Sequence, residues 1–490
     1  MLGNNLYKEK YRPQYHFSPA QNWSNDPNGL VYYQGEYHLF YQYNPNDVVW
    51  GPMHWGHAVS TDLIHWEHLP IALKPDQDLG MIFSGSAVVD KNDTTGFFDG
   101  GEGLVAIYTT HLEQEEGPLQ QQAIAFSKDN GRSWTKYEGN PVIKNYGVPD
   151  FRDPKVFWHE ETQKWLMVVA CHDRVRFYNS TNLKEWNYLS EFGQDIGIHA
   201  EAWECPDLIK MPVEQSKSTD SKADLKEKWL LEVGDIRGGE SGVAVQYFIG
   251  EFDGEKFTSD HKESFFVDQG QDIYALQTWS NLPDKRHIWL GWMNNIGYMT
   301  KIPTTGWRGM MSIPRELSLK EDDERIKLIQ KPIKELQNLR EEIYSAENFE
   351  LEKSKKIEFE EQSYEITAEI DFNQAEEVVF ALHKNKEQES LLKLNRKENK
   401  IIVDLSNSGN TDFDETFLLE KEIDYTFKDD VKINIFADRS SLEVFIDGGE
   451  VSITNLVFPE ESAEEVEIRT DLGKPLINQI EVYKLNSIWS

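Results

Sequence analysis

The sequence predicts an all-β protein, with a β-propeller over residues 1–330 and a β-sandwich over residues 346–490. In the first two-thirds of the chain, short aromatic and β-branched runs alternate with Gly, Asp, Asn and Pro, as short strands alternate with turns. A polar turn that ends on an aromatic residue also recurs along this part, as it can once per unit in a propeller. Beyond Leu319, Trp and Gly become scarce while Glu and Lys become frequent, which indicates a second domain.

The recurring turn is the main argument for the propeller. It occupies residues 60–66, 127–134 and 180–186, each of which begins with Ser and ends with Trp, and it returns more weakly in residues 253–257. The copies lie about 50 to 70 residues apart, which is the length of one multi-strand unit. A β-sandwich with repeated Asx-turn hairpins explains the same pattern and stays open as an alternative. Upstream, residues 29–42 predict a hairpin that turns at positions 34 and 35.

Residues 331–345 predict a helix that links the two domains. Ile333, Leu336 and Leu339 share one helical face, and Pro332 suits the first turn of a helix. Beyond this linker, several segments, such as those at 364–372 and 432–436, alternate polar and apolar side chains, as strands with one buried face do. This alternation is the basis for the C-terminal β-sandwich.

The composition excludes several classes of partner. The 490 residues carry 50 Lys and Arg against 85 Asp and Glu, a formal net charge of -35 that repels nucleic acid and anionic membrane surfaces. The two cysteines, Cys171 and Cys205, are too few for a disulfide framework and lack the spacing of a zinc or redox site. We expect no metal, since His54 and His57 would point to opposite faces of a strand.

The N-terminus and the hydropathy of the chain bear on its location. Residues 1–10 have no apolar stretch of the signal-peptide type, and no later run approaches the roughly 18 apolar residues that cross a bilayer. We therefore expect a cytoplasmic chain that does not contact a membrane, with secretion after removal of a signal peptide as the alternative.

Three carboxylates lie in segments that are aromatic and rich in turn residues. The first is Asp26, which precedes Pro27 and is therefore held in an extended or turn geometry, while Asn25 and Asn28 can donate hydrogen bonds to it. A fixed carboxylate of this kind stays ionised and can act as a nucleophile. A turn without chemistry is the alternative interpretation.

Asp153 and Glu204 complete the set. Asp153 follows Arg152, whose charge favours an ionised carboxylate that can stabilise positive charge; a structural ion pair is the alternative. Glu204 lies between Trp203 and Cys205, where desolvation should raise its pKa toward that of a general acid, although a single Glu in such a place is more often structural. A propeller could bring all three acids to one axial pocket, and paired carboxylates are what glycoside hydrolysis uses.

At these residues the sequence closely resembles glycoside hydrolase family 32, the invertases, inulinases and levanases. Four segments look like the diagnostic motifs of that family in their usual order, namely residues 23–29, 83–86, 151–155 and 204–207. The resemblance extends over nearly the whole chain and includes residues 332–336 and 438–445.

The resemblance implies that the propeller has five blades and carries the catalytic site. It implies a retaining glycosidase without metal or cofactor, in which Asp26 is the nucleophile, Glu204 the acid/base and Asp153 the transition-state stabiliser. The implied fructosyl pocket is lined by Trp23, Asn25, Gln42, Trp50, Phe83, Ser84, Arg152 and Tyr274. A retaining mechanism predicts that the carboxyl groups of Asp26 and Glu204 lie about 5 to 5.5 Å apart, whereas about 9 Å would contradict it.

The expected reaction is the release of terminal non-reducing β-D-fructofuranosyl residues from levan, inulin, fructooligosaccharides and sucrose. A fructosyltransferase acting on sucrose or levan and a non-catalytic sugar-binding propeller are the alternatives. The C-terminal sandwich supports the propeller, binds polysaccharide or forms a homodimer, and support is the preferred interpretation.

Two positions depart from the family pattern. Ser24 stands where the family usually has Met, which indicates a change in packing. Ile296 stands where the family usually has a second Trp after Trp292, so an aromatic wall of the pocket is missing and the substrate preference is affected. Residues 11–17 and 50–55 look more like those of exo-fructanases than those of sucrose-6-phosphate hydrolases.

Overall fold

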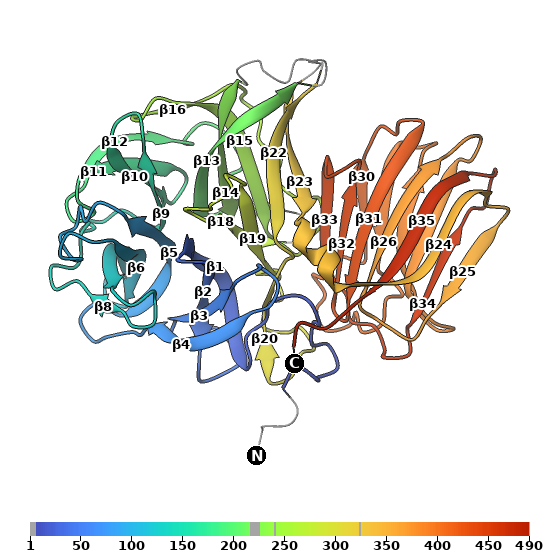
Figure 1. Cartoon of the computed structure of the whole chain (residues 1–490), viewed down its shortest axis with the longest axis horizontal. Helices are drawn as coiled ribbons and strands as arrows, with labels where there is room; N and C mark the ends of the chain where they lie inside the picture. Colours follow the sequence, from blue (N-terminus) through green and yellow to red (C-terminus); the bar gives the residue numbers. More distant parts are fainter. Residues whose placement is uncertain (1–5, 216–225, 240–241, 323–324, 490) are drawn as a thin grey trace.

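The structure, a computed structural model, describes residues 6–215, 226–239, 242–322 and 325–489. These residues fold almost entirely into strands, and the one helical element among them is the 3-10 helix η1 (Lys334–Leu339). Within the same ranges, no helix has the length and apolar character needed to cross a lipid bilayer. The all-β prediction is confirmed, and Figure 1 shows the blue-to-yellow N-terminal sheets beside the orange-to-red C-terminal sheets.

Four sheets make up the N-terminal part of the chain. The first has the order β20-β1-β2-β3-β4 and contains β1 (Asn22–Tyr33), β2 (Glu36–Asn44), β3 (His54–Ser60), β4 (Glu67–Leu73) and β20 (Trp307–Arg308). The second contains β5 (Met81–Asp90), β6 (Gly103–Leu112), β7 (Leu119–Ser127) and β8 (Thr135–Lys136). The third contains β9 (Phe151–His159), β10 (Lys164–Cys171), β11 (Val175–Ser180) and β12 (Asn187–Phe192).

The fourth sheet has ten strands and the order β16-β15-β14-β13-β22-β19-β18, with β17, β21 and β23 attached to β15, β19 and β22. Its first half contains β13 (Trp203–Gln215), β14 (Glu227–Asp235), β15 (Ala244–Phe252), β16 (Phe257–Ser259) and β17 (Phe265–Phe266). Its second half contains β18 (Tyr274–Thr278), β19 (Ile288–Met293), β21 (Met310–Met311), β22 (Arg315–Glu321) and β23 (Ile326–Pro332). A parallel pair of β13 with β22 joins the two halves.

Each copy of the recurring turn joins the third strand of a unit to its fourth strand. The copies connect β3 to β4, β7 to β8, β11 to β12 and, for the weaker one, β15 to β16. In the first copy, Asp62 Oδ1 accepts the backbone N–H groups of the residues two and three positions later, and Asn182 Oδ1 does the same in the third copy. Such Asx turns reverse the chain within a few residues. The sequence repeat therefore reflects a four-stranded unit that recurs along the chain.

The predicted hairpin is formed by β1 and β2. Gln34 and Gly35 have φ of 50° and 89°, the paired positive values of a two-residue turn whose twist matches that of the strands. Toward the start of β1 the ladder is interrupted between Ser24 and Pro27. Such a bulge bends a strand and redirects its side chains, so Asp26 leaves the regular pleat.

The first strands of successive units lie next to one another. β1 contacts β5, β5 contacts β9, β9 contacts β13, β13 contacts β18, and β18 contacts β1 again, so these strands form a closed ring. The three predicted acids lie near the starts of ring strands, with Asp26 on β1, Asp153 on β9 and Glu204 on β13. The ring is therefore the element that brings them together.

The predicted linker helix is wrong at both ends. β23 extends to Pro332, η1 covers Lys334–Leu339 only, and residues 340–345 belong to strand β24 (Arg340–Glu350). Residues 340–350 pair with β35, so pairing with a strand far along the chain overrides the local preference for a helix. Ile333, Leu336 and Leu339 are buried as expected, because a spacing of three residues places side chains on one face of a 3-10 turn as well.

Two six-stranded sheets form the C-terminal part. The first contains β24, β35 (Leu476–Leu485), β26 (Tyr364–Asp371), β31 (Asp430–Asp438), β32 (Ser441–Ile446) and β33 (Val451–Leu456). The second contains β25 (Ser354–Glu358), β34 (Glu465–Arg469), β27 (Glu377–Lys384), β28 (Ser390–Asn395), β29 (Lys400–Asp404) and β30 (Glu420–Asp424). Side chains of both sheets, such as Ile366 and Ile433 of the first and Phe380 and Leu392 of the second, share one buried cluster. The sheets therefore pack face to face as a sandwich.

Buried ion pairs join the two parts of the chain. His16 Nδ1 lies 2.8 Å from Asp438 Oδ2, and His16 Nε2 lies 3.1 Å from Glu443 Oε1. Arg315 donates to Asp268 Oδ2 at 2.9 Å and to Glu443 Oε2 at 2.6 Å. Because these side chains are almost completely buried, loss of one partner would leave an uncompensated charge, which is strongly destabilising.

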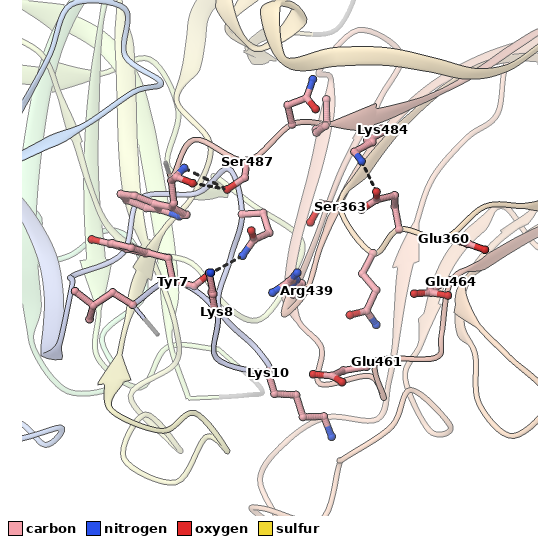
Figure 2. Close-up of a pocket in the computed structure, with 17 residues that line it drawn as sticks. Tyr7, Lys8, Lys10, Glu360, Ser363, Arg439, Glu461, Glu464, Lys484 and Ser487 are labelled. Carbon is pink, nitrogen blue, oxygen red and sulfur yellow. Dashed lines mark hydrogen bonds and ion pairs between the residues drawn. The ribbon is translucent and has the colours of Figure 1, made fainter. Parts of the chain in front are cut away.

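A groove of about 1260 Å³ separates the first described residues from one edge of the sandwich (Figure 2). Tyr7 and Lys8 lie on one side of it, and Glu360, Glu464 and Lys484 on the other. Most residues of its lining are polar and carry both signs of charge, and Leu6, Leu485 and Trp489 add apolar surface. None of the residues that line this groove belongs to the predicted catalytic site.

Candidate active site

Asp26, Asp153 and Glu204 meet around Cys205. Cys205 Sγ lies 3.5 Å from Asp26 Oδ2 and 3.6 Å from Asp153 Oδ2, and Cys205 directly follows Glu204 in the chain. The backbone N–H of Cys205 also donates to Asp153 Oδ2 at 3.0 Å. Strands β1, β9 and β13 thus deliver their carboxylates to one place.

Irregular backbone aims these side chains. The ladder of β13 is interrupted between Glu204 and Asp207, and both Asp153 and Cys205 have positive φ, 64° and 49°. This left-handed conformation is uncommon for residues with a side chain and persists where the surrounding structure holds it in place. For Asp153, the backbone N–H donates to Thr109 Oγ1 at 2.9 Å, which stabilises the turn.

Asp26 is held by donors to both of its oxygens. Ser84 Oγ donates to Asp26 Oδ2 at 2.6 Å, and Asn25 Nδ2 donates to Asp26 Oδ1 at 3.0 Å. Trp23 Nε1 in turn donates to Asn25 Oδ1 at 2.7 Å, which fixes the amide. We expected Asn28 to donate to the carboxylate of Asp26. It donates instead to the backbone carbonyl of Asp26 at 2.7 Å, because its side chain folds back along the turn. The carboxylate of Asp26 therefore has a fixed direction, as a nucleophile requires.

Glu204 has a different environment. Tyr274 OH donates to Glu204 Oε2 at 2.9 Å, and Arg152 Nε donates to Glu204 Oε1 at 3.0 Å. Burial raises the pKa of Glu204 above its ordinary value; Arg152 opposes this rise, and the charge of Asp26 adds to it. The direction is the one expected from the sequence, and a raised pKa suits a carboxyl group that must donate a proton near neutral pH.

Asp153 is more buried than the other two acids, with 6% of its surface exposed. Burial and then the charge of Glu204 raise the pKa of Asp153 to about 7, and the charge of Arg152 offsets only part of this rise. The structural Arg152–Asp153 ion pair of the alternative interpretation is not found among the described residues, and the expectation that Arg152 keeps Asp153 ionised is corrected. The bulged backbone turns the guanidinium toward Glu204 and Asp150 instead.

Arg152 therefore serves several acceptors at once. Its Nη1 donates to Asp150 Oδ1 at 2.5 Å and to Gln120 Oε1 at 3.4 Å, in addition to the bond from Nε to Glu204. The sequence reasoning missed Asp150, Gln120 and Thr109. Only Asp150 offered a signal, because it stands two residues before Arg152 in a segment already singled out.

Aromatic rings line the site. Trp23 and Trp292 lie 6.1 Å apart between ring centroids, Phe83 stacks on His111 at 4.2 Å, and Trp50 meets Phe83 edge-on at 6.1 Å. Trp50 is 43% exposed and therefore lies at the surface. An apolar wall with a few convergent polar groups is typical of a small-molecule site.

Gln42 has an unused hydrogen-bond donor. Its position in β2 lies opposite the bulge at residues 24–27 that contains Asp26. The side chain is buried, and its Nε2 has no hydrogen-bond partner among the described residues. Since buried polar groups are normally satisfied, this amide is suited to bind a hydroxyl group of a ligand.

The two departures from the family pattern have local structural consequences. Ile296 is partly buried and packs against the apolar cluster that contains Trp23 and Trp292. Trp292 Nε1 is buried without a hydrogen-bond partner in the described ranges. Ser24 is fully buried, and its Oγ donates to the backbone carbonyl of Gly309 at 3.3 Å, which agrees with a packing role.

The arrangement can supply a nucleophile and a proton donor. Asp26 is a carboxylate with a fixed direction, and Glu204 is a carboxyl group whose pKa is raised by burial, the pair that glycoside hydrolysis requires. Among the described residues, no group of three or more His, Cys, Asp or Glu side chains is arranged to hold a metal ion.

Comparison with known proteins agrees with this geometry. Residues 16–332 match the profile of the glycosyl hydrolases family 32 N-terminal domain, and residues 335–484 match that of the family 32 C-terminal domain. A levanase of Bacillus subtilis (strain 168) is 46% identical over 99% of this chain and 72% of the levanase, and a levanase of Bacillus sp. (strain L7) is 38% identical over 99% of this chain. The chain spans 53%, about half, of the second levanase.

A solved structure extends the likeness to three dimensions. The crystal structure of exo-inulinase from Aspergillus awamori superposes with a TM-score of 0.91 at 37% identity, and the match covers 99% of this chain and 100% of that one. Both family profiles, the relatives and the superposition thus agree with the carboxylate site, and the chain belongs to glycosyl hydrolases family 32.

Proposed function

We propose that this chain is a retaining β-fructofuranosidase that releases terminal non-reducing β-D-fructofuranosyl residues from fructans, fructooligosaccharides and sucrose. The observation that carries the proposal is the convergence of Asp26, Asp153 and Glu204 at Cys205, with Asp26 and Glu204 in different hydrogen-bonding environments. Similarity to levanases and to an exo-inulinase over 99% of the chain supports a fructoside as the substrate.

In the proposed reaction Asp26 attacks the anomeric carbon of the terminal fructosyl residue while Glu204 protonates the departing oxygen. Water then cleaves the resulting fructosyl ester of Asp26, and Glu204, now ionised, takes the proton from that water. Asp153 acts as the carboxylate that stabilises the positive charge of the transition state. The mechanism requires Glu204 to be protonated and Asp153 to be ionised when the substrate reacts. The separation of about 5 to 5.5 Å between the carboxyl groups of Asp26 and Glu204 stays a prediction.

The proposed fructosyl pocket consists of Trp23, Asn25, Gln42, Trp50, Phe83, Ser84, Arg152 and Tyr274. Its members support the proposal in different ways. Gln42 offers an unused donor to a sugar hydroxyl, and the half-exposed Trp50 at the surface suits the part of the substrate that leaves. The aliphatic Ile296 lowers one wall, so we expect it to influence the preference between β(2,1) and β(2,6) linkages.

We also propose that residues 1–330 form a five-bladed propeller and that a separate sandwich domain begins at β24, with η1 between the two, since residues 340–345 already belong to a strand of the sandwich. The closed ring of β1, β5, β9, β13 and β18 supports five blades, since the ten-stranded sheet then divides at the parallel β13–β22 pair. The boundary between the two family profiles supports the division. A homodimer through the sandwich and the cellular location of the protein stay predictions.

Product analysis tests the proposed reaction. Incubation with levan, inulin and sucrose should release free fructose from all three substrates. From the two polymers, levan and inulin, fructose should be the first product. Longer oligosaccharides from concentrated sucrose would indicate fructosyl transfer, and a complete absence of sugar products would reject a catalytic function.

Substitution of the nucleophile gives the matched comparison. Asp26→Asn should reduce fructose release by several orders of magnitude, because the variant cannot form the covalent intermediate. Asp62→Asn removes a carboxylate from a surface turn and should leave the turnover unchanged. Undiminished turnover in Asp26→Asn would contradict the mechanism.

A further inference from the structure

A chain of polar contacts connects Glu204 with the surface. His172 Nδ1 lies 2.8 Å from Asp150 Oδ2, Arg152 Nη1 donates to Asp150 Oδ1 at 2.5 Å, and Arg152 Nε donates to Glu204 Oε1 at 3.0 Å. The exposed fraction of the side chains falls from 49% at His172 and 33% at Asp150 to 8% at Arg152. The outer two residues are thus open to solvent, whereas the guanidinium is buried.

The backbone holds the outer pair in place. Asp150 and His172 directly adjoin the paired ends of β9 and β10, and both have positive φ, 49° and 59°. The backbone carbonyl of His172 accepts the N–H of Trp203 at 2.6 Å, and Trp203 precedes Glu204. His172 is therefore fixed to the acid/base strand through its backbone and to Asp150 through its ring. Strained residues of this kind persist where surrounding contacts determine them.

We propose that Asp150 and His172 are positioning residues of the active site. They hold Arg152 and thereby set how strongly its hydrogen bonds and positive charge act on Asp150 and how strongly they act on Glu204. The proposal rests on the proposed role of Glu204 as acid/base. Neither residue contacts the three reacting carboxylates themselves; both act through Arg152.

The sign of the effect follows from the charges. Burial lowers the pKa of Arg152, but the charges of Glu204, Asp153 and Asp150 outweigh burial and raise it, so Arg152 stays charged. Because Arg152 also pairs with Asp150, it stabilises the carboxylate form of Glu204 less than it would without Asp150. The other ionisable groups that face Glu204 and Arg152 are Asp26 on β1, Asp153 on β9, Cys205 on β13, Tyr274 on β18 and, through Gln120, His111. Substitutions of Asp150 and His172 leave these groups in place.

Two substitutions should move the acid/base in opposite directions. Asp150→Asn releases the charge of Arg152 to Glu204, stabilises the carboxylate form of Glu204 and should move the basic limb of the kcat/KM profile to lower pH by about 0.5 pH unit or more. His172→Ala removes the donor that shares the charge of Asp150, so Asp150 binds Arg152 more strongly and the basic limb should move to higher pH. His172→Gln, which keeps a donor, should restore the original limb.

Controls separate charge sharing from structural damage. Asp62 pairs with His65 in the turn between β3 and β4 and does not contact Arg152, Asp150 or His172, so Asp62→Asn should leave the limb unmoved. The double variant Asp150→Asn/His172→Ala should behave like Asp150→Asn alone, because His172 acts through Asp150. Basic limbs that do not move, or that move in the same direction in both single variants, would overturn the proposal.

A titration of Glu204 by ¹³C-carboxyl NMR provides a readout that does not need activity. The midpoint for Glu204 should be lower in Asp150→Asn than in the unmodified protein. If the unmodified protein releases no fructose, the proposed function fails, and the NMR titration still tests the division of charge. If fructose is released but neither the limb nor the titration moves, the positioning roles alone are refuted.

Discussion

Replacing His16 with Gln should remove a pH-dependent part of the stability of the protein. Both ring nitrogens of His16 contact buried carboxylates, those of Asp438 and Glu443, so the ring must donate from both nitrogens and is held as an imidazolium. Burial opposes this charge, but the two carboxylates outweigh burial and raise the pKa of His16 from 6.5 to about 9. All three side chains are completely buried.

The magnitude follows from this difference in pKa. The unfolded chain releases the His16 proton near pH 6.5 and the folded protein near pH 9. The stabilisation is therefore fully present below pH 6.5 and is lost as the pH rises through 9. A difference of about 2.5 pH units, at about 1.4 kcal/mol each, corresponds to about 3.5 kcal/mol. His16→Gln should thus lower the free energy of unfolding by about 3 kcal/mol more at about pH 6 than at about pH 10.

Urea unfolding followed by tryptophan fluorescence measures the effect. Comparison of variant and unmodified protein at each pH cancels the titration of the groups that do not interact with His16; Asp438 and Glu443, whose pKa values His16 lowers, belong to the measured effect. His65→Gln is the matched control, because His65 forms a half-exposed pair with Asp62 and should show little dependence of its effect on pH. An equal loss of stability from His16→Gln at both pH values would refute the reasoning.

Three further predictions concern the site and the domain interface. Tyr274→Phe removes a bond that lowers the pKa of Glu204, so the basic limb of kcat/KM should move to higher pH by about one unit; an unmoved limb would show that the hydroxyl does not act on Glu204. Gln42→Leu should lower kcat/KM for fructose release about tenfold without lowering the melting temperature, because Nε2 of the lost amide has no partner among the described residues; unchanged kinetics would exclude its role in binding. Truncation after Gln330 should abolish stable folding, since Arg315 and Asp268 lose their sandwich partners; a stable, fully active fragment would contradict the supporting role of the sandwich.

Much of the fold could be predicted because its signals are local. The Ser-to-Trp repeats encode an Asx turn between two strands, and this turn needs only neighbouring residues. The parallel pair of β13 with β22 could not be predicted, because it joins segments about 100 residues apart through tertiary packing. The prediction of a linker helix was wrong for a related reason. Residues 340–345 form a strand because β35, far along the chain, pairs with them.

The site also combines features that the local sequence reveals with contacts that depend on the tertiary fold. Asp26, Asp153 and Glu204 could be found from their unusual local sequence, and the structure brings them together. That Arg152 bonds to Glu204, Asp150 and Gln120 could not be predicted, because a bulge decides where its side chain points. Asp150 forms the contact that adjacency in the sequence had suggested for Asp153.

The role of Asp26 as the nucleophile is the central claim, and covalent trapping tests it most directly. In Glu204→Ala, β-D-fructofuranosyl fluoride should still react with Asp26, because fluoride leaves without an acid, whereas hydrolysis of the ester is slow without the base. Mass spectrometry of the digested protein should then find a fructosyl group on Asp26. A fructosyl group on another residue, or steady release of fructose from the fluoride without any adduct, would contradict the account.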